Sequence, residues 1–437
     1  MVFKFSGTSL DQEHLENLQY YKYAAVDKSL ISNYILRHYW NAVVNLFPLW
    51  MAPNLITLLG LAFMMINVAL VAIYVPDLST EAPNWIYFSF AAGLWLYSTF
   101  DNVDGKQARR TGTSSPLGEA FDHGCDALNC CFVAILQSAA LGLGQSYSSI
   151  GLVLVTVVGF YLSTAEEYFT KVLYLGIVNG PTEGILVSCL AFIWSGFYGA
   201  QSWHVPLADI SCLSWVSALL PSGTRCADVF VWGMFVFFLT THCPFCFASI
   251  YRVCKEKSLK LFNVLVTILY PITSYMLAVY LLISSPYSHI FENNDVILFS
   301  LVIGILFGMM ASDIIVAHLT VNVYPSFKFV LGLLWTMAIL VNIPYFGTHF
   351  LSQQSEHIAL WTIFISLVTL YLIWATQIIR AFCKFLGINC LTIRRQPQSI
   401  PQDNEAQTES DALLDHQEGG QILSSGNPTS SSYNTFQ

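Results

Sequence analysis

Four aspartates occupy two short stretches of an otherwise apolar part of the sequence. Asp101 and Asp104 are three residues apart, and Asp122 and Asp126 are four residues apart. On helices, residues at these spacings lie on one face, so each pair presents its carboxylates together. Four clustered negative charges repel one another unless cations neutralise them, and hard divalent cations prefer oxygen ligands. The spacing therefore predicts a site for divalent cations, two of which would clamp a diphosphate.

A purely structural role accounts for only part of this cluster. Acids near helix ends can cap the backbone or pair with neighbouring cations, here Lys106, Arg109 and Arg110. One or two of the acids are explained in this way. Metal binding explains all four.

Residues between and beside the aspartates suit the same chemistry. Gly105 and Gly118 have no side chain, so a phosphate or a neighbouring backbone can come close. His123 is a candidate general base, because histidine ordinarily titrates near neutral pH. Glu119 stands one helical turn before His123, where its carboxylate can orient the imidazole. The alternatives are that His123 only starts a helix, with Asp126 as the base, and that Glu119 is an ordinary acid near a helix N-terminus.

The elements that must hold these residues are membrane-spanning helices. Of 437 residues, 55% are hydrophobic and only 10% are charged, against about 25% charged in soluble domains. Apolar runs of about 20 residues recur, which is the length a helix needs to cross a bilayer. Alternating barrel-type strands are absent from the pattern. We expect an all-α polytopic membrane domain at residues 55–395, and the net charge of −9 implies no nucleic-acid partner.

The hydropathy pattern predicts about ten spans. Their expected ranges are Leu55–Tyr74, Ile86–Asp101, Ala127–Leu143, Ile150–Tyr168, Gly184–Gln201, Val229–Ser249, Leu261–Ser284, Ile297–Leu319, Phe329–Phe346 and Ile358–Ile379. Lysine and arginine concentrate in every second connection between these spans, which puts them on one side of the membrane, and Arg225 is the only basic residue in the opposite loops. Basic residues remain cytosolic, so we expect both termini and the aspartates to face the cytosol.

Two segments flank the predicted membrane domain. In residues 1–54, the stretch 29–47 places apolar residues at helical spacing beside basic ones, which predicts an interfacial amphipathic helix. Pro53 ends it, and Asn54 and Thr57 open the first span, either as caps or as polar groups that face a site. Residues 396–437 are rich in polar residues and almost without aliphatic clusters, so we expect a disordered tail.

The aspartates belong to a longer pattern, Asp-x-x-Asp-Gly-x-x-Ala-Arg, eight residues, Gly, three residues, Asp, three residues, Asp. All eight fixed positions are filled, by Asp101, Asp104, Gly105, Ala108, Arg109, Gly118, Asp122 and Asp126. This pattern resembles the signature of the CDP-alcohol phosphotransferases. Residues 104–110, 115–119 and 121–126 are similar to the eukaryotic choline/ethanolamine branch, especially the plant-type aminoalcohol phosphotransferases. The resemblance covers roughly residues 15–395.

The resemblance implies an enzyme that moves phosphocholine or phosphoethanolamine from CDP-choline or CDP-ethanolamine to 1,2-diacylglycerol and releases CMP. It implies that the four aspartates hold two Mg²⁺ or Mn²⁺ ions and that His123 takes the acceptor's proton. It also implies that Asn54 and Arg109, beside Gly105 and Gly118, contact the CDP-alcohol. A homodimer in the membrane of the endoplasmic reticulum or the Golgi is expected.

Two alternatives remain open at this point. One is the same chemistry with a different alcohol or acceptor, although the smaller enzymes of that kind have fewer helices. The other is an ion-coupled transporter whose intramembrane acids bind ions. Transport would predict related halves, and the aspartate cluster is not repeated in the second half of the sequence.

Overall fold

A computed structural model describes residues 10–211, 214–347 and 352–394. The described chain is mostly helical, and its only regular strands are β1 (Ala25–Asp27) and β2 (Leu173–Leu175), which pair in parallel. The predicted tail at residues 396–437 lies outside these ranges. The prediction of an all-α architecture is confirmed, and the short β1–β2 pair is an addition to it.

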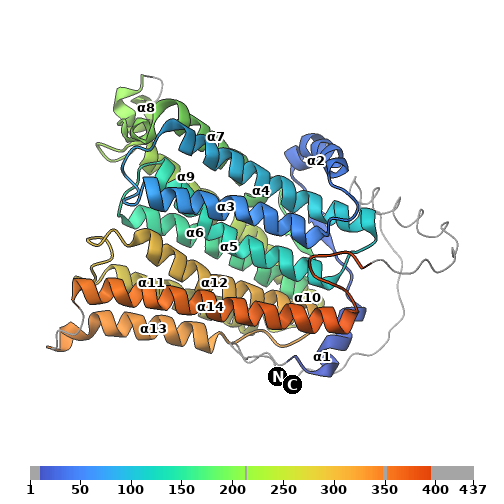
Figure 1. Cartoon of the computed structure of the whole chain (residues 1–437). Coiled ribbons are helices and arrows are strands. Elements are labelled where there is room, and N and C mark those ends of the chain that lie inside the picture. The colour runs from blue at the N-terminus through green and yellow to red at the C-terminus, as the bar shows by residue number, and fades with distance from the viewer. Residues whose placement is uncertain (1–9, 212–213, 348–351, 395–437) are drawn as a thin grey trace, which may run out of the picture. The chain divides into compact units, whose positions relative to one another are not determined.

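Long helices run side by side through the described chain (Figure 1). They are α3 (Pro53–Tyr74), α4 (Asn84–Thr111), α5 (Pro116–Ala140), α6 (Tyr147–Thr170), α7 (Ile185–Tyr198), α9 (Cys226–Phe237), α10 (Cys243–Glu256), α11 (Leu261–Ile283), α12 (Val296–Leu319), α13 (Lys328–Asn342) and α14 (Gln353–Leu386). A π-helical turn, η7 (Phe238–His242), joins α9 to α10. Short helices fill the connections: α1 (Gln12–Glu16), η1 (Asn17–Gln19), η4 (Gly180–Gly184), η5 (Ala200–His204), η6 (Leu207–Asp209), α8 (Ser214–Ser217) and η8 (Ile343–Phe346).

Seven helical stretches in the described ranges are long and apolar enough to cross a membrane, which agrees with a polytopic membrane protein. They comprise α3, α6, the joined α9 and α10, α11, α12, α13 and α14. Helices α4, α5 and α7 occupy the other three predicted ranges. α4 and α5 carry the charged residues of the signature, and α7 has only 14 residues. The number of ten spans therefore stays a prediction.

The hairpin formed by α4 and α5 has clear local causes. Gly112 ends α4 with a left-handed φ of 64°, a conformation that glycine adopts without strain. Ser115 then caps α5 by accepting a hydrogen bond from a backbone N–H, and Pro116 occupies the first turn. Both helices extend beyond the predicted span ends at Asp101 and Ala127. As a result, all four aspartates of the signature stand on regular helix.

Helix α12 packs against α5, α6 and α14 and is buried along almost its whole length. It therefore supports the hairpin on the side of α5. Close contact with α5 depends on Gly304. A Cβ atom at this position would lie 2.5 Å from Cys131 Sγ and 2.7 Å from Cys131 Cβ. The absence of a side chain at Gly304 thus sets the separation of the two helices.

The helix predicted within residues 29–47 is present as η2 (Ser32–Leu36), α2 (Arg37–Val43) and η3 (Val44–Leu46), beside the end of α4 (Figure 1). One side packs on α4 through Leu36, Trp40, Val44 and Val103. Tyr34, Ile35 and Leu46 point away, with exposed fractions of 74%, 63% and 80%. An outward row of large apolar side chains is what a helix lying in a membrane interface requires.

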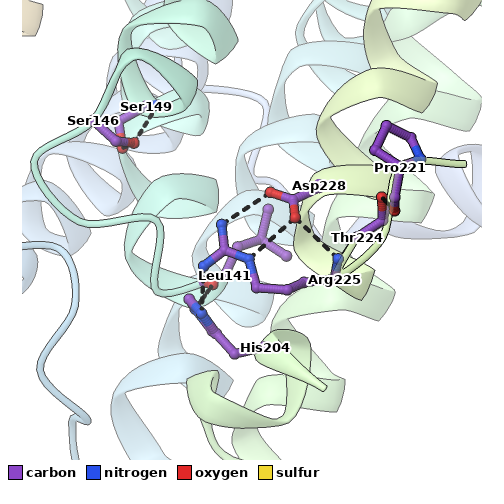
Figure 2. Close-up of polar contacts among 8 residues, drawn as sticks. All are labelled: Leu141, Ser146, Ser149, His204, Pro221, Thr224, Arg225 and Asp228. Carbon is purple, nitrogen blue, oxygen red and sulfur yellow. Dashed lines mark hydrogen bonds and ion pairs between the residues drawn. The ribbon is translucent and has the colours of Figure 1, made fainter. Parts of the chain in front are cut away.

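Polar contacts join the start of α9 to η5 and to the C-terminal end of α5 (Figure 2). The Arg225 guanidinium donates to both carboxylate oxygens of Asp228, with Nη2 at 2.9 Å from Oδ1 and Nε at 3.1 Å from Oδ2. Its Nη1 also lies 3.0 Å from His204 Nδ1, and His204 Nε2 lies 3.1 Å from the carbonyl of Leu141 at the end of α5. The single basic residue predicted for this side is therefore paired.

Candidate active site

Three of the four signature carboxylates converge where α4 and α5 face each other. Carboxylate oxygens of Asp101, Asp122 and Asp126 all lie within 4.8 Å of one another. Asp104, the fourth member, is buried and accepts a hydrogen bond from the hydroxyl of Thr57 on α3. Both predicted pairs thus contribute to one group, which consists of Asp101, Asp122 and Asp126.

Two hydroxyl groups hold individual aspartates in place. Thr57 bonds Asp104, and the Tyr97 hydroxyl donates to Asp126. The N-cap of α3 is Ala52, so Thr57 serves as a polar group facing the site, which was one of the two open interpretations. Tyr97 was not predicted. Its sequence position carried a signal, because it stands one turn before Asp101 on the same helix.

The donor set of this cluster suits divalent metal ions. Oδ1 of Asp101 and Oδ1 of Asp122 are buried and have no hydrogen-bond partner among the described residues. Buried polar atoms are almost always paired, and several carboxylates this close are unfavourable without cations. Oxygen ligands from aspartate are those that Mg²⁺ and Mn²⁺ prefer. The geometry accordingly fits a metal-binding acidic cluster.

The residues predicted to contact the CDP-alcohol lie at the same end of the helices. Asn54 is buried one turn before Thr57, and its Nδ2 donates to Cys390 Sγ at 3.6 Å. A Cβ atom at Gly118 would lie 3.7 Å from Asn54 Oδ1, which places the start of α5 against the start of α3. A Cβ atom at Gly105 would lie 3.8 Å from Arg109 Nη1.

Two adjacent arginines have different surroundings. Arg110 donates from Nη1 to the carbonyl oxygens of Val44 and Phe47, both at 2.9 Å, and so fastens η3 to α4. Arg109 is exposed and has no hydrogen-bond or ion-pair partner within the described ranges. Its guanidinium is therefore available for an anion such as a phosphate.

His123 is buried beside the aspartates and contacts a carboxylate from another helix. Its Nε2 lies 3.3 Å from Glu167 Oε2 on α6, and its Nδ1 has no partner in the described chain. Glu119, predicted to bind this imidazole, is buried too, but neither of its oxygens has a described hydrogen-bond partner. The contact from α6 was missed because spacing within one helix carries no information about which distant helix packs against it.

Glu119 and Glu167 form a second buried group with His318 of α12. One ligand atom from each of the three lies within 4.8 Å of the others. The ammonium of Lys171, just after α6, donates to His318 Nδ1 at 3.4 Å. Burial, reinforced by the nearby charge of Lys257, lowers the pKa of Lys171 to about 8.

The N-terminal segment reaches this region. Tyr23, two residues before β1, is 57% exposed. Burial of its hydroxyl end and the charges of Asp122 and Glu167 nevertheless raise the pKa of Tyr23, while Arg109 opposes this shift. The N-terminal segment thus brings the Tyr23 hydroxyl within reach of the charges of Asp122 and Glu167.

Two other glutamates, Glu166 and Glu183, have structural partners. Glu183 accepts hydrogen bonds from the Ser29 hydroxyl at 2.5 Å and from the backbone of Asn179 at 2.8 Å, which ties the N-terminal segment to η4. Glu166 is directed to Cys246 and Ser249 on α10. Neither belongs to the two clusters described above.

Comparison with known proteins agrees with the site geometry. Residues 50–207 match the model of the CDP-alcohol phosphatidyltransferase family. The chain is 33% identical to choline/ethanolaminephosphotransferase 1 of Saccharomyces cerevisiae over 401 residues, covering 89% of this chain and 99% of the relative. It is 34% identical to choline/ethanolaminephosphotransferase 1 of Arabidopsis thaliana, covering 87% and 97%. Cholinephosphotransferase 1 of Saccharomyces cerevisiae matches at 47% identity, covering 47% of this chain and 52% of the relative.

These relatives extend over nearly the whole chain, and the family match contains every residue of the aspartate cluster. With the eight signature positions filled and the carboxylates converging on one point, this chain belongs to the CDP-alcohol phosphatidyltransferase family.

Proposed function

We propose that this protein transfers phosphocholine or phosphoethanolamine from CDP-choline or CDP-ethanolamine to 1,2-diacylglycerol. The products are CMP and phosphatidylcholine or phosphatidylethanolamine. The observation that carries the proposal is the convergence of the signature carboxylates next to a buried histidine. The names of full-length relatives, choline/ethanolaminephosphotransferases, support this choice of donor.

The reaction needs a base for a poorly nucleophilic hydroxyl. The acceptor oxygen forms a bond to the β-phosphorus, the bond from that phosphorus to the CMP oxygen breaks, and the hydroxyl proton passes to His123. Because His123 Nε2 faces Glu167, the proton would go to Nδ1, which has no described partner. Glu119, one turn away, would stabilise the imidazolium through its charge.

The remaining signature residues would position the donor. Asp101, Asp104, Asp122 and Asp126 would hold two Mg²⁺ or Mn²⁺ ions, which when bound neutralise the charge of the diphosphate. The free guanidinium of Arg109 and the amide of Asn54 would bind the nucleotide portion. Gly105 and Gly118 leave room for the phosphates.

The location follows from the two substrates. A water-soluble donor and a lipid acceptor meet at a membrane boundary, so the carboxylates would lie at such a boundary. From the distribution of basic residues, we place this end and both termini in the cytosol. The membrane would be that of the endoplasmic reticulum or the Golgi, and the enzyme would act as a homodimer.

The test is CMP release by the purified protein in detergent with diacylglycerol and each CDP donor, with and without Mg²⁺. Turnover that requires the metal and is lost in Asp122→Asn and His123→Ala is expected. The Glu166→Gln variant, altered outside the site, should retain activity. Folded protein that releases CMP from neither donor would contradict the proposal.

A further inference from the structure

The connection between α10 and α11 concentrates positive charge at a membrane boundary. It joins two stretches that are long and apolar enough to cross a membrane, the first ending at Glu256 and the second beginning at Leu261. Four basic residues stand at this junction: Arg252, Lys255, Lys257 and Lys260. Glu256 is the single acid between residues 252 and 260, so this segment, the basic turn, has a strong positive charge.

The backbone holds these charges close together. The N–H of Leu259 donates to the carbonyl of Cys254 at 2.8 Å, and Ser258 between them has a left-handed φ of 54°. This is the geometry of a tight cap at a helix C-terminus. Arg252 and Lys255 are three residues apart and lie on one face of α10. The four cations therefore occupy one helix end and one short turn.

The basic side chains have no anionic partners. All four are exposed, and none of them forms an ion pair within the described ranges. Lys257 donates to the carbonyl of Phe169 at 3.2 Å, at the end of α6. It thereby approaches Lys171, whose pKa is lowered by burial and also by the charge of Lys257. Positive charges at this density repel one another, and a bound anion would relieve the repulsion.

Large apolar side chains accompany the charges. Tyr251 and Phe262 flank the basic turn with exposed fractions of 56% and 76%, and Leu259 within it is 40% exposed. Exposed aromatic residues at the end of a membrane span are typical of the level of the lipid head groups. A soluble anion would satisfy only the charges, whereas a phospholipid offers an anionic head group and apolar chains together.

The location, charge and apolar surroundings thus point to the same kind of ligand. Clusters of lysine and arginine next to a membrane span attract anionic head groups. We propose that the basic turn at residues 252–260 binds the head groups of anionic phospholipids in the surrounding bilayer. This surface is separate from the aspartate cluster, and its role does not depend on which donor the enzyme uses.

The experiment measures lipid binding to the purified full-length protein in nonionic detergent. Native mass spectrometry during a titration gives the affinity of the first bound phosphatidylserine, and phosphatidylcholine with the same acyl chains is the reference without net charge. Wild-type protein should bind phosphatidylserine about tenfold more tightly or better. Each basic residue strengthens binding to an anionic surface roughly fivefold, so Arg252→Gln/Lys255→Gln should weaken phosphatidylserine binding about tenfold or more. Its phosphatidylcholine binding should not change.

A matched control removes two charges elsewhere. Arg380→Gln/Lys384→Gln alters exposed residues near the end of another membrane-crossing stretch, Gln353–Leu386, and should bind phosphatidylserine like wild type. Arg252→Lys/Lys255→Arg keeps both charges and should also bind like wild type. Equal losses in the two glutamine variants would overturn the proposal, because any basic residue at the boundary would then be equivalent.

Two further results would also overturn it. If Arg252→Gln/Lys255→Gln does not fold, wild-type protein alone decides, since equal affinity for the two lipids would exclude a site for anionic head groups. Glycerophosphoserine, the soluble head group without acyl chains, should not displace phosphatidylserine. Displacement at equal concentration would show that the basic turn binds a soluble anion instead of a lipid.

Discussion

The hydroxyl of Tyr97 on α4 donates a hydrogen bond to Asp126 on α5, across the contact between the two signature helices. A carboxylate fixed in this way presents its other oxygen in one direction, which matters when it binds a metal ion. Tyr97→Phe keeps the ring and removes the donor. We expect kcat/KM to fall about 10- to 100-fold and the Mg²⁺ concentration for half-maximal activity to rise. CMP release measured across a Mg²⁺ titration checks this, and an unaltered titration curve would contradict it.

Thr57 has the equivalent relationship with Asp104, from a third helix. Thr57→Val preserves the side-chain shape but removes the hydroxyl, so Asp104 would lose its orientation. Activity should fall about tenfold or more. Thr57→Ser, which retains the donor, is the matched control and should keep most of the activity. Equal losses in both variants would assign Thr57 to packing alone.

Metal removal should destabilise wild-type protein more than a variant that lacks one of the carboxylates. In wild-type protein, Mg²⁺ binds the folded state and should raise Tm, because ligand at about 100 times Kd stabilises by about 2.7 kcal/mol. In Asp122→Asn, one of the mutually repelling charges is gone. This variant should be more stable than wild type in chelator and less responsive to Mg²⁺. Thermal unfolding in detergent with chelator or Mg²⁺ measures both effects.

Lys171 should make stability depend on alkaline pH. Its pKa is lowered from 10.5 to about 8, so between these values the folded protein binds fewer protons than the unfolded chain. Stability linked to this group therefore rises as pH increases from about 8 towards 10.5. The Tm of wild type relative to Lys171→Met should increase over this window. If the Tm values of the two proteins changed with pH in the same way, the pKa of Lys171 would not be lowered in the folded protein.

Gly304 offers a test of the support behind the site. In Gly304→Ala, the new methyl would collide with Cys131, forcing α12 away from α5. We expect a loss of about 1–3 kcal/mol in unfolding free energy, the usual cost of overpacking a core. Gly332→Ala on α13 is the control, since nothing lies within 4 Å of its added Cβ. Comparable Tm values for the two variants would contradict the close packing.

The sequence was sufficient for features that depend on local spacing. Asp122 and Asp126 fall on one helical face because they are four apart, and Ser115 and Pro116 mark the start of that helix. It was insufficient for contacts between distant helices. The approach of Glu167 to His123 depends on how α6 packs against α5, which no local pattern encodes.

Strand β1 was not predicted either. It has only three residues, and its strand geometry depends on a partner far along the chain. A stretch of this length carries no usable alternation of apolar and polar residues. Its detection required the packed structure.

The parallel pairing of β1 with β2 has a consequence for biosynthesis. Parallel strands cannot form a local hairpin, and here α3, α4, α5 and α6 all lie between the two strands. A chain emerging from the ribosome must therefore deliver these four helices to the membrane before residues 25–27 can pair. Residues 25–27 are thus synthesised before the helices that carry the aspartates but take up their strand geometry only after them.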